Sequence, residues 1–229
     1  MRLGIPICIF AKPPAAAKTR LIPALGEVRT AQLASAMLLD TWRMVASCPG
    51  ARPVLATTQP LGFPMEVPAE DIWLQSDGDL GQRIARIMTR GLIHAPAAVA
   101  IGADSPTLAP VHIKAALELI RTNDAVVGPC TDGGFYLLAL RQCPPALFAS
   151  LPWSTAGTRQ ALVKRLEENA FTIAHLEPLF DIDTPADLRF LKEHLEEHPD
   201  AHSSLGPAMQ AWYSENRMRV INTPPCESA

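Results

Sequence analysis

Three cations follow the first apolar segment of the chain. The run Ile5 to Phe10 is apolar, Lys12 comes soon after it, and Lys18 and Arg20 lie across a loop of prolines and alanines. In open parallel sheets ligands bind outside the carboxyl ends of the strands, so these side chains are candidates for chemistry. Lysine and arginine there suit phosphate oxygens, with which they form charge-assisted hydrogen bonds. Because the loop lacks the GxxxxGK[ST] pattern, a solvated basic loop is the alternative.

Aspartates stand at the ends of three further apolar segments. Asp104 ends "AVAIGADSP", Asp132 lies in "VVGPCTDGG", and Asp181 and Asp183 lie in "LFDIDTPADL". Each has a structural alternative, since aspartate also ends strands, forms turns and begins helices. Carboxylates at successive strand ends, opposite cations, favour a magnesium ion that bridges bound phosphates.

The composition excludes several classes of protein. A net charge of −3 and a pI near 6.1 give no general attraction to nucleic acid or to an anionic membrane. The five cysteines are widely spaced and form no CxxC pair, which argues against a disulfide framework and a zinc site. The six histidines show no metal-binding spacing, and neither a GxSxG elbow nor a Cys-His arrangement indicates covalent catalysis. With no apolar run of about 18 residues, we expect a cytoplasmic protein with a small-molecule substrate.

Short apolar runs alternate with segments of helical period, which is typical of a mainly parallel sheet flanked by helices. With 229 residues and 48% hydrophobic content, we predict a single α/β domain over residues 1–197. For residues 198–229 we expect a tail, with a short helix at "AMQAWYSENRMR" as one option, either loosely ordered or packed on a partner, as in a homodimer. Predicted strands span 4–10, 53–58, 71–75, 97–104, 124–129, 135–140 and 171–176, and predicted helices span 28–46, 80–93, 110–121, 155–169 and 184–197.

Six blocks carry a family resemblance. They are "FAK…KTRL", "LQSDGDLGQRI", "AIGADSPTL", "VVGPCTDGGFYLLAL", "PWSTAGT" and "DIDTPADL". In this order they resemble the transferase family associated with radical-SAM and selenodomain gene clusters, which is glycosyltransferase-like and related to 2-phospholactate guanylyltransferase. The resemblance spans Leu3 to Leu195 and implies a GT-A-type, nucleotide-diphospho-sugar transferase fold with three layers. The short "PPAAA" spacing before Lys18 is more similar to the guanylyltransferase branch, whereas "DGGFYLLAL" is more similar to the selenodomain-associated branch.

The resemblance also implies roles for individual residues. Lys18 and Arg20 would meet the donor phosphates and, with Asp104, form the catalytic group. Asp104 and Asp183 would bind Mg²⁺ or Mn²⁺. Ser154 and Thr155 fit a helix cap first and a substrate contact second. The full nucleotide-binding set is Ala11, Lys12, Lys18, Arg20, Gln75, Asp79, Gly81 and Arg83, and the acceptor-binding set is Asp132, Gly133, Gly134, Phe135, Ser154 and Thr155.

These observations predict a metal-dependent transferase that uses an NTP or a sugar nucleotide and a small acceptor. Three cations favour nucleotidyl transfer, because they would stabilise charge at the α-phosphorus, whereas the family's usual description favours glycosyl transfer. A third alternative is a nucleotide-binding regulator without turnover. The presence of Asp104 and Asp183, the implied metal ligands, argues against this alternative.

Overall fold

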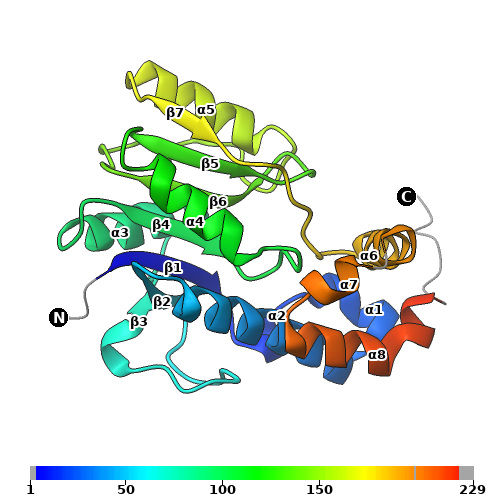
Figure 1. Cartoon of the computed structure of the whole chain (residues 1–229). Helices are drawn as coiled ribbons and strands as arrows, with labels where there is room; N and C mark the ends of the chain where they lie inside the picture. Colours follow the sequence, from blue (N-terminus) through cyan, green and yellow to red (C-terminus); the bar gives the residue numbers. More distant parts are fainter. Residues whose placement is uncertain (1–3, 199, 222–229) are drawn as a thin grey trace.

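Seven strands form one sheet in the order β3-β2-β1-β4-β6-β5-β7 (Figure 1). The computed structural model describes residues 4–198 and 200–221. All neighbouring strands pair in parallel except β6, which runs antiparallel to both β4 and β5. The predicted, mainly parallel sheet is therefore confirmed. The strands are β1 (Ile5–Ala11), β2 (Ala51–Thr57), β3 (Ile72–Leu74), β4 (Ala98–Gly102), β5 (Ala125–Pro129), β6 (Phe135–Leu140) and β7 (Ile173–His175).

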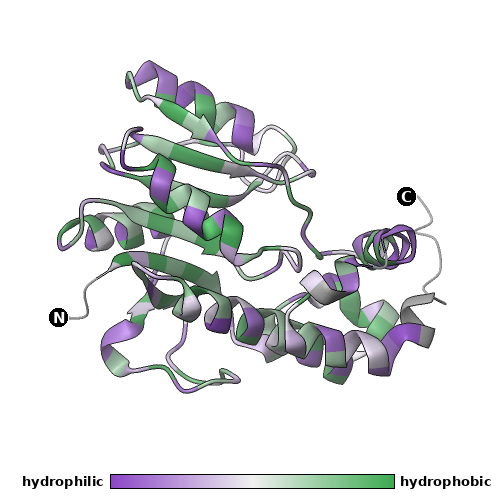
Figure 2. Ribbon diagram, viewed as in Figure 1, coloured by the Kyte–Doolittle hydropathy of each residue, from purple (hydrophilic) through white to green (hydrophobic). Residues whose placement is uncertain are grey.

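Helices cover both faces of this sheet. The helices are α1 (Ile22–Leu25), α2 (Glu27–Ser47), α3 (Leu80–Leu92), α4 (Pro110–Leu119), α5 (Thr158–Glu168), α6 (Pro185–Glu197), α7 (Ala201–Ser204) and α8 (Pro207–Ile221), with 3-10 turns η1 (Pro14–Ala16), η2 (Thr19–Leu21) and η3 (Ala69–Asp71). Ile7 and Ile9 pack with residues of α2 and α4, whereas Cys8, between them, packs on the other face with Ile87 of α3. This alternation buries apolar side chains on both faces and produces the predicted three layers. Figure 2 shows the central strands coloured mostly as hydrophobic.

The reversed direction of β6 follows from the length of its connection. Only residues 130–134 separate β5 from β6. A parallel pair needs a crossover of a dozen or more residues, so this short connection returns the chain antiparallel. The residues of this connection include three of the predicted acceptor-binding positions.

The start of α6 positions one of the site aspartates. Thr184 is the N-cap and accepts a hydrogen bond from the backbone N–H of Asp187 at 3.4 Å, as predicted from the sequence. The carboxylate of Asp187 in turn accepts the N–H groups of Asp183 and Thr184 at 2.9 and 2.7 Å. This capping box fixes the backbone of Asp183 immediately before the helix.

The C-terminal segment forms two helices, and α8 packs on α2 of the same chain. Met209, Trp212 and Tyr213 are buried in a cluster with side chains of α2 and α6. Asp40 of α2 accepts the N–H groups of Ala208 and Met209 at 3.1 and 2.8 Å and so caps the first turn of α8. Packing on the chain's own helix thus accounts for the order of this segment, although the domain limit at residue 197 and a homodimer remain predictions. Residues 222–229 of the predicted tail lie outside the described residues. Within the described chain no helix is long and apolar enough to cross a membrane.

Candidate functional site

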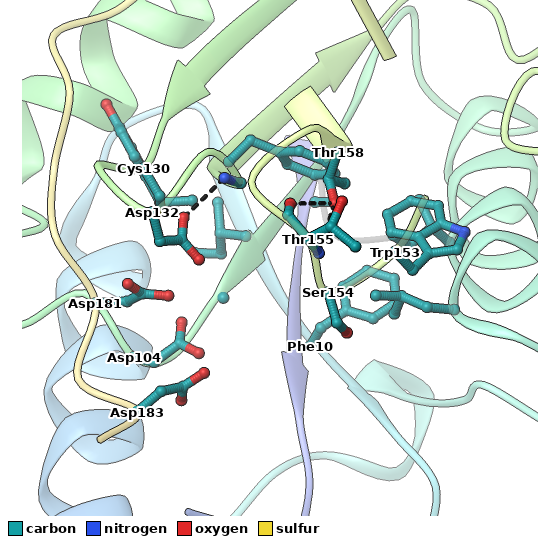
Figure 3. A pocket seen from close by; sticks show the side chains of 18 of the residues that line it. Phe10, Asp104, Cys130, Asp132, Trp153, Ser154, Thr155, Thr158, Asp181 and Asp183 are labelled. Carbon is teal, nitrogen blue, oxygen red and sulfur yellow. Dashed lines mark hydrogen bonds between the residues drawn. The ribbon is translucent and has the colours of Figure 1, made fainter. Parts of the chain in front are cut away.

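A cavity of about 600 Å³ lies at the carboxyl ends of β1 and β4 (Figure 3). The loop after β1 and the 181–183 segment both contribute residues to its lining. The cavity therefore collects the strand-end charges that the sequence singled out. Its charged lining residues are Lys12, Lys18, Arg20, Asp104, Asp132, Asp181 and Asp183.

Three carboxylates form a compact group inside the cavity. One oxygen from each of Asp104, Asp181 and Asp183 lies within 4.8 Å of the others. Oxygen ligands in such a group suit Mg²⁺ or Mn²⁺, so the residues present fit the predicted cation. The sequence placed Asp181 at a strand end but did not include it among the metal ligands. Its spacing from Asp183 in "DID" was the available signal.

The chain path explains how these three carboxylates converge. Ile182 is fully buried and donates its N–H to the carbonyl oxygen of Asp104 at 3.0 Å, which ties the 181–183 segment to the end of β4. A Cβ on Gly102 would lie 2.3 Å from the Asp104 carboxylate, so glycine makes room for that side chain. Because alternate residues of an extended segment point to opposite sides, burial of Ile182 directs Asp181 and Asp183 into the cavity.

Asp181 has the most altered environment of the group. Burial raises its pKa to about 7, and the nearby carboxylates of Asp104, Asp132 and Asp183 add to the effect. A cation at this place would favour the ionised form and reverse the shift. The raised pKa is thus the electrostatic result of crowding acids in one place.

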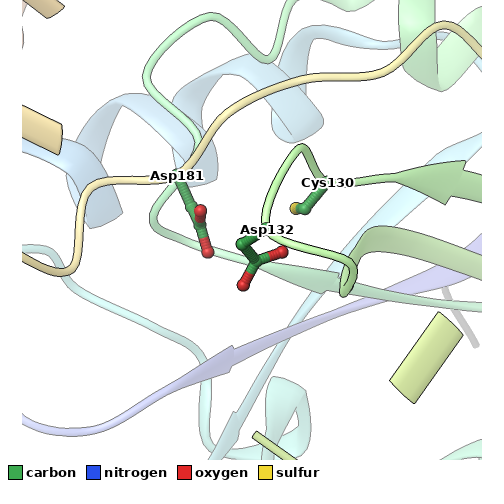
Figure 4. Close-up of side chains that lie close together, drawn as sticks. All are labelled: Cys130, Asp132 and Asp181. Carbon is green, nitrogen blue, oxygen red and sulfur yellow. The ribbon is translucent and has the colours of Figure 1, made fainter. Parts of the chain in front are cut away.

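Asp181 also belongs to a second group, with Cys130 and Asp132 (Figure 4). Burial raises the pKa of the Cys130 thiol well above its usual range, and neighbouring acids raise it further. Only the thiolate is a good metal ligand, and Mg²⁺ prefers oxygen. The group formed by three carboxylates therefore fits the predicted cation better.

Lys18 is paired with two of the three carboxylates. Its ammonium donates to Asp104 Oδ2 at 3.1 Å and also to Asp183 Oδ1. Burial alone would lower the pKa of Lys18, but the two carboxylates outweigh this effect and raise it. The side chain is only 10% exposed. Lys18 is thus not a solvated surface lysine, and its ammonium occupies the neighbourhood in which a metal ion would meet Asp104 and Asp183.

The backbone at Lys18 is shaped to direct this side chain inward. Lys18 has a left-handed conformation (φ 54°) and its carbonyl accepts the N–H of Leu21, which is fully buried. A non-glycine residue at positive φ is uncommon and is held in place by the surrounding structure. Leu21 anchors the turn, while Lys12 and Arg20 on either side are exposed.

Five residues of the predicted nucleotide-binding set lie outside the lining of this cavity, and four of them make local contacts within the protein. Gln75 is buried and donates to Ala56 O at 2.8 Å. Asp79 caps α3, and Arg83 donates to a backbone carbonyl in the preceding turn. Gly81 packs against Trp153 and Phe148. Ala11 lines a neighbouring cavity of about 250 Å³ that shares Lys12, Lys18, Asp104 and Asp183 with the first. Nucleotide contacts of these five residues remain predictions.

Five of the six predicted acceptor-binding residues line the cavity: Asp132, Gly134, Phe135, Ser154 and Thr155. Gly133 lies behind them at φ 92°, and a Cβ there would come within 2.1 Å of Ala156 O. The carbonyl of Gly133 also accepts the N–H of Arg159 at 2.9 Å. These contacts hold the loop after β5 against the loop before α5.

Apart from Phe135, sequence reasoning missed the large apolar residues of the lining. Phe10, Leu80, Ile84 and Trp153 all face this cavity. Trp153 stands directly before the singled-out hydroxyls in "PWSTAGT", which was the only available signal. The others could not be distinguished from core residues, because their apolar type suits the interior equally well.

Several solved structures share this fold. A candidate nucleotide-diphospho-sugar transferase from Desulfovibrio desulfuricans G20 matches with a TM-score of 0.81 and 22% identity, over 95% of this chain and 97% of that one. A CMP:2-keto-3-deoxy-manno-octonic acid synthetase complexed with CTP matches with a TM-score of 0.52 and 15% identity, over 86% and 99%. A 4-diphosphocytidyl-2C-methyl-D-erythritol synthase from Anaerococcus prevotii DSM 20548 gives 0.52 and 10%, over 85% and 96%. The fold is therefore the predicted nucleotide-diphospho-sugar transferase-like fold.

The sequence comparisons give the family. No curated protein matches the chain significantly. Residues 41–155, just over half of the chain, match the model of a bacterial family. The chain belongs to the family described as "Uncharacterized protein conserved in bacteria (DUF2064)".

Proposed function

We propose that this protein is a metal-dependent transferase that takes a nucleoside triphosphate or a sugar nucleotide as donor and a small molecule as acceptor. The observation that carries the proposal is the meeting of the cations after β1 with Asp104, Asp181 and Asp183 in one cavity. Proteins with this fold include a synthetase complexed with CTP. A fold alone supplies no function, so the proposal rests on the site.

Asp104, Asp181 and Asp183 would hold Mg²⁺ or Mn²⁺. When bound, the ion neutralises charge on the donor phosphates and on the leaving group. Arg20 is exposed at the cavity and would bind phosphate oxygens through its guanidinium. Asp132 and the hydroxyls of Ser154 and Thr155 would orient the acceptor.

Lys18 would change partners when the donor binds. In the metal-free protein its ammonium neutralises Asp104 and Asp183. A divalent cation would replace it there, and the released ammonium would reach the donor phosphates. One side chain cannot pair fully with both groups, so metal and nucleotide should bind with positive cooperativity.

Calorimetric titration tests the proposal directly. NTPs and sugar nucleotides would be titrated with and without Mg²⁺ or Mn²⁺, and we expect tighter binding with the metal. A ligand at a hundredfold its dissociation constant would also stabilise the fold by about 2.7 kcal/mol, which a thermal-shift screen detects. Absence of nucleotide binding at millimolar concentration with either metal would end the proposal. Binding without turnover of any donor would instead support the regulator alternative.

A further inference from the structure

The cavity has two chemically different sides. Figure 3 shows the carboxylates on one side, with Phe10 and Trp153 across the cavity from them. Trp153 meets Phe135 edge-on, with ring centroids 6.3 Å apart. Phe10, Ile84, Phe135 and Trp153 belong to one hydrophobic cluster, and Leu80 precedes Gly81, which lies against Trp153. We call these five lining residues the apolar wall: Phe10, Leu80, Ile84, Phe135 and Trp153.

The apolar wall is held in a fixed arrangement. Gly81 lies so close to Trp153 that a Cβ would sit 3.0 Å from the indole nitrogen and 2.7 Å from Phe148 O. Phe148 is buried and supports the indole, with ring centroids 6.4 Å apart. Leu80, the first residue of α3, lies 42% exposed at the cavity. An exposed apolar group on a rigid wall gains free energy when a ligand covers it.

The charges of the lining are divided unevenly. Among the described lining residues every cation, Lys12, Lys18 and Arg20, comes from the segment after β1. On the predicted acceptor side, the loop after β5 with the start of β6 (residues 130–136) and the loop before α5 with its first residue (residues 153–158) contribute Asp132 and no cation to the lining. An anionic acceptor would therefore meet a carboxylate without a compensating positive charge.

The geometry points to an acceptor that is uncharged and carries a flat ring, either a sugar ring or a hydroxylated aromatic ring, whose face covers Trp153. Trp153 and Leu80 would then determine acceptor specificity. Both kinds of ring share the required chemistry, which is one apolar face with hydroxyl groups at the edge. Exposed Ser154, next to Trp153 in the chain, offers a hydroxyl to such an edge. The hydroxyl of Thr155 donates to Pro152 O at 2.8 Å, so Thr155 could only accept a hydrogen bond from the ring. The inference rests on the proposed function and names the acceptor class of that site.

Matched probes test this inference on the full-length protein with Mg²⁺, with and without UDP, GDP or CDP. Saturation-transfer NMR would compare glucose with glucose 6-phosphate, and phenol with phenyl phosphate. We expect at least one neutral member to bind and its phosphorylated partner to bind about tenfold more weakly or not at all. Trp153→Ala should weaken the neutral probe about three- to tenfold, and Trp153→Phe should restore most of the loss, while nucleotide affinity stays unchanged.

Leu80 has a matched control in the same helix region. Leu80→Ala should weaken the neutral probe a few-fold, whereas Ile93→Ala, which removes a 67% exposed side chain at the other end of α3, should not. Equal or tighter binding of the phosphorylated probes would overturn the inference, as would unchanged probe binding in Trp153→Ala. A loss of nucleotide affinity in Trp153→Ala would assign the apolar wall to the donor site, and this result would also overturn the inference. Failure of wild-type protein to bind any nucleotide would refute the proposed function, whereas nucleotide binding without any neutral probe refutes this inference alone.

Discussion

Two ion-pair sites of the protein differ in the exposure of their carboxylates. One joins Arg52 to Asp71, and the other joins Lys18 to Asp104 and Asp183. Asp71 is fully buried and accepts two hydrogen bonds from the Arg52 guanidinium, at 2.9 and 2.7 Å. The side chains of Asp104 and Asp183 are 34% and 45% exposed, although the Lys18 ammonium is covered. A second cation can therefore approach the latter carboxylates but not Asp71.

The chemistry of the two cations strengthens this contrast. A guanidinium holds a carboxylate in a fixed planar geometry, whereas an ammonium is a point charge on a flexible stem. The Arg52 pair joins the start of β2 to η3 and lies beside Trp73. A buried ion pair in this protein is therefore structural where its acid is enclosed, and exchangeable where its acids face a cavity.

The largest expected effect breaks the structural pair. Arg52→Met removes the guanidinium from buried Asp71 and should lower the free energy of unfolding by about 3–5 kcal/mol. Urea denaturation followed by circular dichroism measures it, with exposed Arg121→Met as the control. Nucleotide affinity of the folded variant should be unchanged. A loss below about 1 kcal/mol would place this pair with ordinary surface ion pairs.

Asp104→Asn tests the exchangeable site. It keeps the side-chain shape but removes a carboxylate, so metal-dependent nucleotide binding should weaken at least about a hundredfold, or about 2.7 kcal/mol. Asp183→Asn should behave in the same way. The double variant should be little worse, because residues that act through one ion are not additive. Calorimetry with Mg²⁺ measures these affinities.

The control for both variants is Glu193→Gln, which makes the same charge change at an exposed position of α6. Additive losses that do not depend on metal would mean that Asp104 and Asp183 share no ion, and the site assignment would be withdrawn.

Lys18→Met should separate metal binding from nucleotide binding. Without the ammonium the crowded carboxylates repel one another, so the metal-free melting temperature should fall by a few degrees and Mg²⁺ should restore it. Affinity for Mn²⁺ alone should rise about tenfold, while nucleotide affinity should fall. Lys12→Met, which removes an exposed lysine of the same cavity, should show neither metal effect. An unchanged melting temperature with weaker nucleotide binding would favour the simpler reading of Lys18 as a phosphate ligand only.

The smallest expected effect concerns pH. Because the pKa of Asp181 is raised to about 7 in the folded protein, the folded state binds more protons than the unfolded state between about pH 4 and 7. The metal-free protein should therefore gain stability from Asp181 as the pH falls through this window, and lose it as the pH rises through 7. The difference in melting temperature between the wild type and Asp181→Asn, measured across this pH range without metal, isolates this contribution. A difference that does not vary with pH would contradict the raised pKa.

The local pattern of the chain was enough to find most elements. The 3.6-residue period of 80–93 and the Thr-Pro-Ala-Asp start at Thr184 predicted α3 and α6 to within about a residue, since capping and amphipathic period are properties of neighbouring residues. The predicted start of the helix at 155–169 was three residues too early. There α5 begins at Thr158, and Thr155 hydrogen-bonds within the preceding loop.

The candidate site was only partly predictable. Residues at strand ends could be found from the sequence because parallel strands bring their carboxyl ends to one edge. Gln75 directly follows β3 and Arg83 lies in the first turns of α3, yet the side chains of both donate to backbone carbonyls of the protein. Which way a side chain points depends on the neighbouring segments, and these are distant in sequence.

Local patterns predicted the α/β class, most strand and helix positions and the gathering of cations and acids at one edge of the sheet, because these follow from apolar period and chain order. The pairing of Lys18 with Asp104 and Asp183 could be seen only in the folded chain, as could the place of Asp181 beside them and of Trp153 across the cavity. The pairing joins residues 86 and 165 positions apart. Electrostatic and packing free energies depend on distances of a few ångströms between such residues, and no local pattern encodes those distances.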